Sequence, residues 1–152
     1  MSRTIEVRLQ NRLSELERVG EAVESFGEAH SLPGKVVQAL ALCVDEVITN
    51  VISYAYDDQA DHQITLRLSL GTEELAAEVE DDGKPFNPLD APPPDLTQSL
   101  EDRPIGGLGV HFLRTLMDGV EYRRAQGKNL LVMKKKLPVQ PAQESRACEG
   151  GA

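Results

Sequence analysis

The chain has 152 residues, a formal net charge of −9 at pH 7 and a sequence pI of about 4.8, so one domain with a sizeable core is expected. So acidic a chain is a poor candidate for binding nucleic acid or an anionic membrane non-specifically. Its two cysteines cannot make a disulfide framework, no run of about 18 apolar residues is present, and the N-terminus lacks a signal-peptide core. We therefore predict a soluble cytoplasmic protein.

The first half of the chain alternates between strand and helix periodicities. Ile5–Leu9 alternates apolar and charged side chains, which predicts a half-buried strand. Ser14–Glu17 has the pattern of a capping box and opens a predicted helix that is broken at Leu32–Gly34. The next helix, Ala41–Tyr56, is too apolar for a surface helix, and its apolar stripe extends backwards to Val37. This helix is expected to pack into the core.

The second half holds two predicted hairpins with a short helix between them. Ile64–Leu70 alternates strictly and returns, after a turn, as a second strand at Leu75–Glu80. The short helix is expected at Leu108–Met117, and the strands Val120–Arg124 and Asn129–Lys135 form the last hairpin. This order predicts an α+β fold with one mixed, mainly antiparallel sheet and helices on a single face.

A region of breaker residues, Asp81 to Pro104, separates the hairpins and contains six of the nine prolines. Structureless loops beyond about 12–15 residues in a compact domain are usually functional or disordered. After Pro138 the composition turns polar and small, which predicts a disordered tail over residues 138–152. The domain itself is predicted to span residues 1–137.

Polar residues interrupt the apolar helix along one line. Cys43, Glu46, Asn50 and Ser53 share that line, because residues three and four apart are neighbours on a helix. A carboxylate and a carboxamide one turn apart in a core are costly unless a polar group meets them. The helix is therefore expected to face a polar ligand.

Two glycine-bearing stretches flank the long loop. In Asp81–Phe86 the carboxylate can accept a hydrogen bond from an exocyclic amine and Gly83 lets the backbone approach a flat ring, although alone the stretch is more simply a charged turn. In Gly106–Gly109 the backbone amides and a helix N-terminus can bind phosphate, although such glycines are more often a hinge. The latter is not a P-loop, because no Gly-Lys-Ser/Thr follows.

The ordered set of these features is specific. Glu46-x-x-x-Asn50 on a helix, Asp81-x-Gly83 after a strand and Gly107-x-Gly109 at a helix start resemble the N, G1 and G2 boxes of one ATP-binding superfamily. That superfamily, the Bergerat fold, is shared by gyrase, histidine kinases and MutL-type repair proteins. Within it, DEVITNVISYAY, EDDGKPFNP and RPIGGLGVHFLRTLMD resemble the motifs of the stand-alone anti-sigma-factor serine kinases. The resemblance covers about residues 5–137.

The resemblance implies a role for each of these residues. Asn50 would supply an oxygen to Mg²⁺, and Glu46 would be the general base. Asp81 would accept the adenine amine of ATP, and Gly83 would give the base room. Backbone amides would wrap the phosphates at Gly106, Gly107, Leu108 and Gly109.

The resemblance also identifies residues from about 87 to 105 as the ATP lid, from which Arg103 would reach the γ-phosphate. The chain departs from the family at two places. Tyr54 stands where a histidine is frequent, and Lys128 and Asn129 stand where a threonine is expected near the last strand. Neither place is assigned a part in the chemistry.

The function implied is that of a cytoplasmic protein serine/threonine kinase that uses ATP and Mg²⁺ in a partner-switching circuit. Its substrate would be a serine on a STAS-domain anti-anti-sigma antagonist. A sigma factor and a second copy of the chain are further partners that the resemblance suggests, whereas direct contact with nucleic acid or membrane is not expected. The alternative is a non-catalytic ATP-binding regulatory module that sequesters a partner protein. Glu46 favours the kinase, because binding alone needs no base at that position.

Overall fold

The structure, a computed structural model, describes residues 3–87 and 113–138. Its elements in chain order are β1 (Thr4–Gln10), the 3-10 turn η1 (Leu13–Glu15), α1 (Leu16–Ala29), α2 (Gly34–Tyr54), β2 (Gln63–Leu70), β3 (Glu74–Asp81), β4 (Gly119–Ala125) and β5 (Lys128–Lys136). Residues 113–116 are also helical, as predicted for the end of the short helix. Most of the expected lid, the glycine stretch at 106–109 and the tail beyond Pro138 lie outside the described residues.

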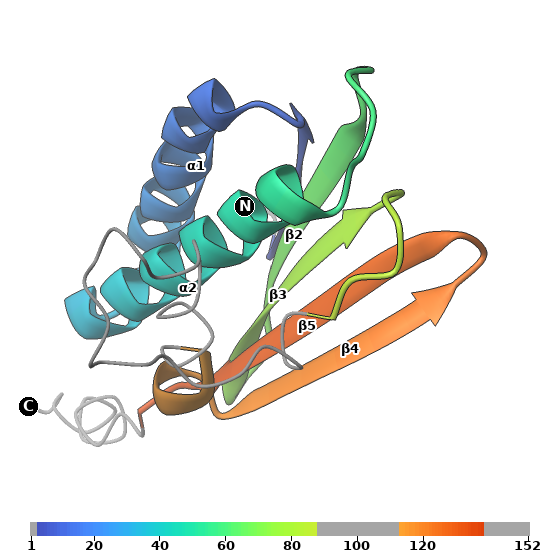
Figure 1. Cartoon of the computed structure of the whole chain (residues 1–152). Coiled ribbons are helices and arrows are strands. Elements are labelled where there is room, and N and C mark those ends of the chain that lie inside the picture. Colours follow the sequence, from blue (N-terminus) through green and yellow to red (C-terminus); the bar gives the residue numbers. More distant parts are fainter. Residues whose placement is uncertain (1–2, 88–112, 139–152) are drawn as a thin grey trace, which may run out of the picture.

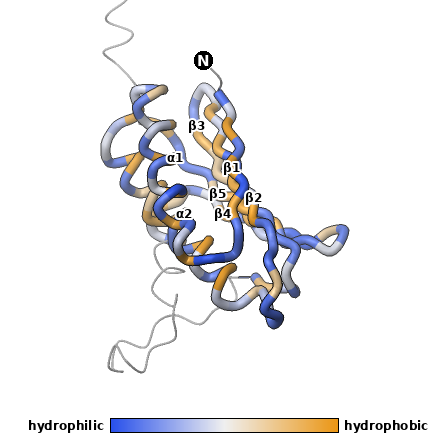
Figure 2. Tube along the Cα trace, turned by 90° about the horizontal axis from the view of Figure 1, so that it is seen from above, coloured by the Kyte–Doolittle hydropathy of each residue, from blue (hydrophilic) through white to orange (hydrophobic). Residues whose placement is uncertain are grey.

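The strands form one five-stranded sheet in the order β1-β2-β3-β5-β4, and its pairings are antiparallel in the described part of the chain. The register places Val7 opposite Leu66, Leu66 opposite Val79, and Val79 opposite Leu131. Apolar side chains of four strands therefore share one face. Figure 1 shows α1 and α2 packed on that face, and Figure 2 shows both helices on the same side of the strands. The predicted sheet with helices on a single face is confirmed.

The helix α2 supplies much of the core. It begins at Gly34, earlier than the predicted Ala41, and its apolar stripe lies against the sheet. Burying one large apolar side chain contributes about 1.5–3 kcal/mol, so a stripe of this length holds the helix in place. By length and composition α2 could cross a membrane, but 50% of its most apolar window is buried within the protein. A core helix passes the same test, and the packing gives α2 that role.

The start of α1 differs from the predicted capping box. In this fully described segment α1 begins at Leu16, and its N-cap residue Glu15 makes no side-chain cap bond. The Glu15 carboxylate instead accepts the backbone N–H of Gln10 at 2.9 Å and the guanidinium of Arg18 at 2.9 Å. The two partners bind different oxygens of the same carboxylate, so Glu15 ties β1 to α1, and Ser14 is not the cap.

Candidate functional site

Of the described candidate residues, Asp81 and Gly83 lie at the end of β3, where the chain contacts the end of α2. Asp81 is the last residue of β3, and Asn129 lies opposite it in β5. A cavity of about 10 Å³ lies beside this pair, lined by Val47, Val51, Val79, Asp81, Phe86, Tyr122, Asn129 and Leu131. That volume corresponds to roughly one water molecule. The cavity therefore has apolar walls and one polar end.

The carboxylate of Asp81 forms the polar end together with the residues that bind it. It is 3% exposed, and its Oδ1 accepts the backbone N–H of Gly83 at 2.8 Å and the Nδ2 of Asn129 at 2.9 Å. Burial raises the pKa of Asp81, and the two hydrogen bonds act against that rise because they stabilise the ionised form. Both bonds end on the same oxygen, which leaves Oδ2 for a ligand.

The position of Gly83 requires a residue without a side chain. A Cβ there would lie 2.4 Å from the carbonyl oxygen of Ala55 and 2.6 Å from its Cβ. The next residue, Lys84, donates its backbone N–H to the same carbonyl at 2.8 Å. The loop after β3 thus closes tightly on the end of α2, and this contact sets where Asp81 sits. Space for a nucleobase at Gly83 stays a prediction.

Asn129 is the centre of the polar network, although its sequence context gave it no part in the chemistry. The side chain is 3% exposed. Its Nδ2 donates to Oδ1 of Asp81 at 2.9 Å and to the carbonyl oxygen of Lys84 at 2.8 Å. Its Oδ1 accepts from three donors, the Tyr122 hydroxyl at 2.5 Å, Arg124 Nη1 at 3.1 Å and the Phe86 N–H at 3.3 Å. Both ends of the carboxamide are therefore occupied.

One sequence signal could have found Asn129. It shares the inward side of β5 with Leu131 and Met133, so a strand that otherwise turns apolar residues inward carries a buried amide. A buried polar side chain needs a partner, and Asp81 is the residue opposite. The register between β3 and β5 was the missing information.

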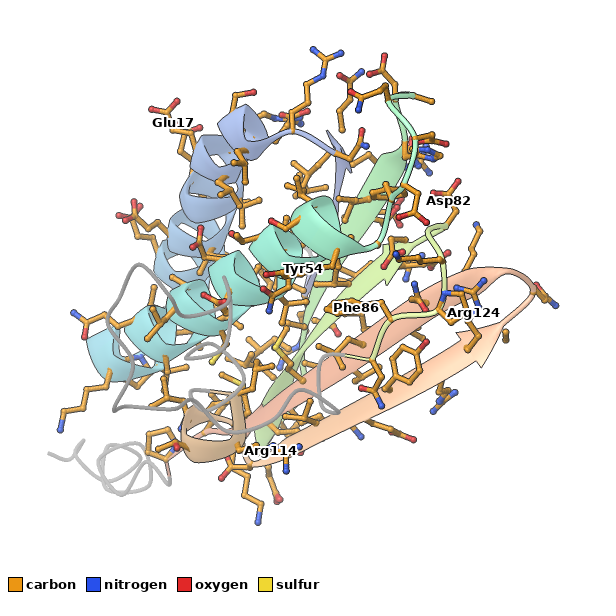
Figure 3. All side chains as sticks on the ribbon, viewed as in Figure 1. Glu17, Tyr54, Asp82, Phe86, Arg114 and Arg124 are labelled. Carbon is orange, nitrogen blue, oxygen red and sulfur yellow. The ribbon has the colours of Figure 1, made fainter. Side chains whose placement is uncertain are left out.

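Two further side chains brace the loop after β3. Arg124 donates from Nη1 to the carbonyl oxygen of Gly83 at 2.8 Å. The ring of Phe86 lies 5.8 Å from that of Tyr54, centroid to centroid, at 34°. Figure 3 shows Tyr54 on α2, Phe86 in the loop and Arg124 on β4. The loop is held from α2, β4 and β5 together.

The polar line on α2 has a different character. Asn50 is 2% exposed, and among the described residues neither its Oδ1 nor the buried Oε2 of Glu46 has a hydrogen-bond partner. Burial raises the pKa of Glu46, and the neighbouring charge of Asp45 adds to the rise. Two unpaired buried oxygens one helical turn apart cost about 1–3 kcal/mol each unless a ligand or water meets them.

The outer members of the predicted line are not part of that site. Cys43 is fully buried, and burial raises the pKa of its thiol to about 11, so the group stays protonated at neutral pH and is a small core residue. Ser53 is exposed. The line therefore reduces to Glu46 and Asn50.

The chemistry of this pair fits a Mg²⁺ ion that arrives with phosphates. Carboxamide and carboxylate oxygens are hard ligands, and Mg²⁺ commonly binds through one or two of them together with water and phosphate oxygens. Within residues 3–87 and 113–138, no group of three or more His, Cys, Asp or Glu side chains could hold a metal on its own. Arg103 and the residues 106–109 lie outside the described residues, so their places around the phosphates stay predictions.

Residues 9–135 match the family of the histidine kinase-like ATPase domain. The match covers most of the chain, including α2, the strands β2, β3 and β4, nearly all of β5 and both polar clusters. The chain belongs to this family of ATP-binding domains.

Curated relatives carry kinase names. The chain is 33% identical over 94 residues to the serine/threonine-protein kinase BtrW of Bordetella bronchiseptica, covering 62% of this chain and 66% of that protein. It is 29% identical over 104 residues to the serine-protein kinase RsbW of Listeria monocytogenes, covering 66% of each. The match thus spans just under two thirds of the length of these relatives.

Solved structures share the fold. The RsbU and RsbW domains of Rv1364c from Mycobacterium tuberculosis superpose with a TM-score of 0.62 at 11% identity, covering 88% of this chain and 32% of that one. The histidine kinase domain of the blue-light activated kinase EL346 from Erythrobacter litoralis gives a TM-score of 0.53 at 20% identity, covering 88% and 63%. At these identities the likeness shows the fold alone.

Proposed function

We propose that this chain is a cytoplasmic serine/threonine protein kinase and anti-sigma regulatory factor that transfers the γ-phosphoryl group of ATP to a serine of a STAS-domain antagonist. The observation that carries the proposal is a pair of buried oxygens, on Glu46 and Asn50, that have no partner among the described residues. The pair lies on α2, whose valines line a cavity with an acid at its end. The kinase names of the relatives support the same reaction class. A sigma factor and a second copy of the chain are the further proposed partners.

The cavity beside Asp81 is the proposed adenine site. Oδ2 of Asp81 accepts a hydrogen bond from the exocyclic amine of the base, and the valines of α2 pack against the ring. A volume of about 10 Å³ cannot hold a nucleobase. Phe86, which lines the cavity from the loop, therefore moves outward when the nucleotide enters.

The phosphates extend from this cavity along α2. Asn50 Oδ1 is the proposed Mg²⁺ ligand, and the ion that it would hold would supply positive charge to offset the negative charge of the phosphates. Residues outside the described part complete the proposed phosphate site, namely Arg103, Gly106, Gly107, Leu108 and Gly109. Residues from about 87 to 105 are the proposed lid, and 138–152 the proposed disordered tail.

Glu46 is the proposed general base. The partner's serine oxygen forms a bond to the γ-phosphorus, the bond from that phosphorus to the bridging oxygen of ADP breaks, and the hydroxyl proton passes to Oε2 of Glu46. Burial raises the pKa of this carboxyl, which makes it a stronger base at neutral pH. A site that bound ATP without transferring phosphate would need no base at this position.

The test is incubation of the chain with γ-labelled ATP and the STAS proteins encoded near its gene. The expected result is label on a serine of one of them, lost in Glu46→Gln. Glu24→Gln is the matched control, because it makes the same change at an exposed acid on α1. If the wild-type chain binds a STAS or sigma partner with ATP and transfers no label, the non-catalytic regulatory module is the better description.

A further inference from the structure

The polar network at the end of the cavity can take only one orientation of the Asn129 carboxamide. Its Nδ2 faces two acceptors, Oδ1 of Asp81 and the carbonyl oxygen of Lys84. Its Oδ1 faces backbone and side-chain donors, including the N–H of Phe86. A flipped amide would set oxygen against oxygen and N–H against N–H, so the surroundings decide the orientation. The N–H directed at Asp81 is thus a fixed feature of the fold.

We propose that Asn129 is a positioning residue that selects adenine over guanine by holding Oδ1 of Asp81 and thereby turning Oδ2 toward the base. This inference rests on the proposed function, which assigns the cavity to the nucleobase. Adenine presents an amine to an acceptor at this place. Guanine presents a carbonyl oxygen, so two acceptors would face each other in a buried site.

The selection requires that Asp81 stays ionised. Burial opposes the charge, and the carboxylate of Asp82 opposes it further. The N–H groups of Asn129 and Gly83 and the positive charge of Arg124 favour it. From the end of α2, Tyr56 faces Asp81 as a neutral phenol, because burial raises its pKa. Removing the Asn129 donor therefore raises the pKa of Asp81 and turns its carboxyl from an acceptor toward a donor.

The decisive variant is Asn129→Asp, which keeps the shape of the side chain and replaces the donor facing Asp81 by oxygen. ADP and GDP affinities are measured by calorimetry between pH 5.5 and 8. At pH 7 the variant is expected to bind ADP at least about tenfold more weakly, the loss that accompanies one charge-assisted hydrogen bond. ADP binding should be lost at low pH, where Asp81 becomes protonated, and the midpoint of that loss should lie at a higher pH in the variant. The ratio of ADP to GDP affinity should be smaller.

Two companion variants separate positioning from general destabilisation. Asn129→Thr keeps a hydroxyl that can donate to Asp81, so it should restore much of the wild-type pH profile. Val23→Ala removes buried volume on α1, far along the chain from the network, and should lower the melting temperature without moving the pH profile or the nucleotide preference.

The outcomes distinguish this inference from the function beneath it. If folded Asn129→Asp binds ADP with the wild-type pH profile and preference, Asn129 does not position Asp81. The same conclusion follows if its losses merely track melting temperature as those of Val23→Ala do. If the wild-type chain binds neither ADP nor GDP, the assignment of the cavity to a nucleobase is wrong and the inference falls with it.

Discussion

Two polar clusters are buried along the interface between α2 and the sheet, and they differ in how their atoms are paired. At the ends of β3 and β5, Asp81 and Asn129 bond to each other and to the surrounding backbone. On α2, Glu46 and Asn50 each hold a buried oxygen without a partner in the described part of the chain. The orientation of the first cluster is fixed before any ligand arrives, and only Oδ2 of Asp81 is left open. The second cluster is the one that, in our proposal, a ligand completes.

The difference matches two tasks. Recognition of a flat, rigid nucleobase needs an acceptor held in one orientation. The hydrogen bonds to Oδ1 of Asp81 hold its carboxylate in this way, so little conformational entropy is lost on binding. Handling phosphates and a moving proton needs polar atoms that are still available. The unpaired Asn50 oxygen costs about 1–3 kcal/mol in the absence of a ligand, and in our proposal the arriving cation would relieve that cost.

The largest effect is expected at the unpaired cluster. Glu46→Gln keeps size and hydrogen bonding but cannot accept a full proton, so phosphotransfer should fall by roughly 10²–10⁴-fold, the usual range for a positioned base. ATP affinity should stay near normal, because the base acts only when the proton leaves. Single-turnover transfer and a nucleotide titration on the same protein give both values. Phosphotransfer by Glu46→Gln at the wild-type rate would show that Glu46 is not the general base.

The fully bonded cluster should respond in binding instead. Asp81→Asn replaces the charged acceptor, and the loss of a charge-assisted hydrogen bond should cost about 1.5–3 kcal/mol of nucleotide affinity. Asp61→Asn is the matched control, since it makes the same change at a side chain that is 65% exposed and pairs with Arg12. Calorimetry with ATP and Mg²⁺ checks both. Equal affinities for wild type and Asp81→Asn would mean that Asp81 does not bind the adenine.

A glycine substitution tests whether the loop is held as tightly as the geometry indicates. Gly83→Ala places a Cβ against the backbone of Ala55, so the free energy of unfolding should fall by about 1–3 kcal/mol. Gly20→Ala, within α1, meets no atom within 4 Å and should raise it by about 0.5–1 kcal/mol. Denaturant titration of both variants measures the difference. Two changes of the same sign would contradict the close contact between the loop and α2.

The smallest effect is expected at His62, which contacts Asp82 in the loop after β3. His62 Nε2 lies 2.9 Å from Oδ1 of Asp58, its Nδ1 lies 3.3 Å from Oδ1 of Asp82, and its ring stacks on Tyr56. The hydrogen bond to Asp58 raises the pKa of His62 above its usual 6.5. Protonated His62 therefore stabilises the fold below about pH 6.5, and this stabilisation is lost as the pH rises through the raised pKa of His62.

His62→Gln should flatten that part of the pH dependence. The free energy of unfolding is compared at pH 6 and pH 8 for both proteins, and the decrease toward pH 8 should be smaller in the variant. An unchanged slope would show that His62 does not brace the loop that carries Asp82.

Much of this architecture follows from local patterns. Alternation in Ile64–Leu70 and Leu75–Glu80 is a short-range feature, and it predicted these strands near their observed bounds. The apolar stripe before Tyr56 predicted the core helix and nearly its end, although the helix begins at Gly34 and not at Ala41. The positions of Glu46 and Asn50 on one line of α2 follow from helix periodicity alone. That both oxygens are buried and unpaired within the described residues is a finding of the structure.

The tertiary structure alone decided the contacts between residues that are far apart in the chain. Asn129 meets Asp81 only because β5 pairs with β3 in one register, and a shift of one residue would turn the amide to the other face. Gly83 is needed because the loop closes on Ala55 at the end of α2. Glu15 joins β1 to α1 because one carboxylate oxygen accepts the N–H of Gln10 and the other binds Arg18. Periodicity says which face a side chain takes, but the partner on that face is chosen by the packing of elements that are distant in sequence.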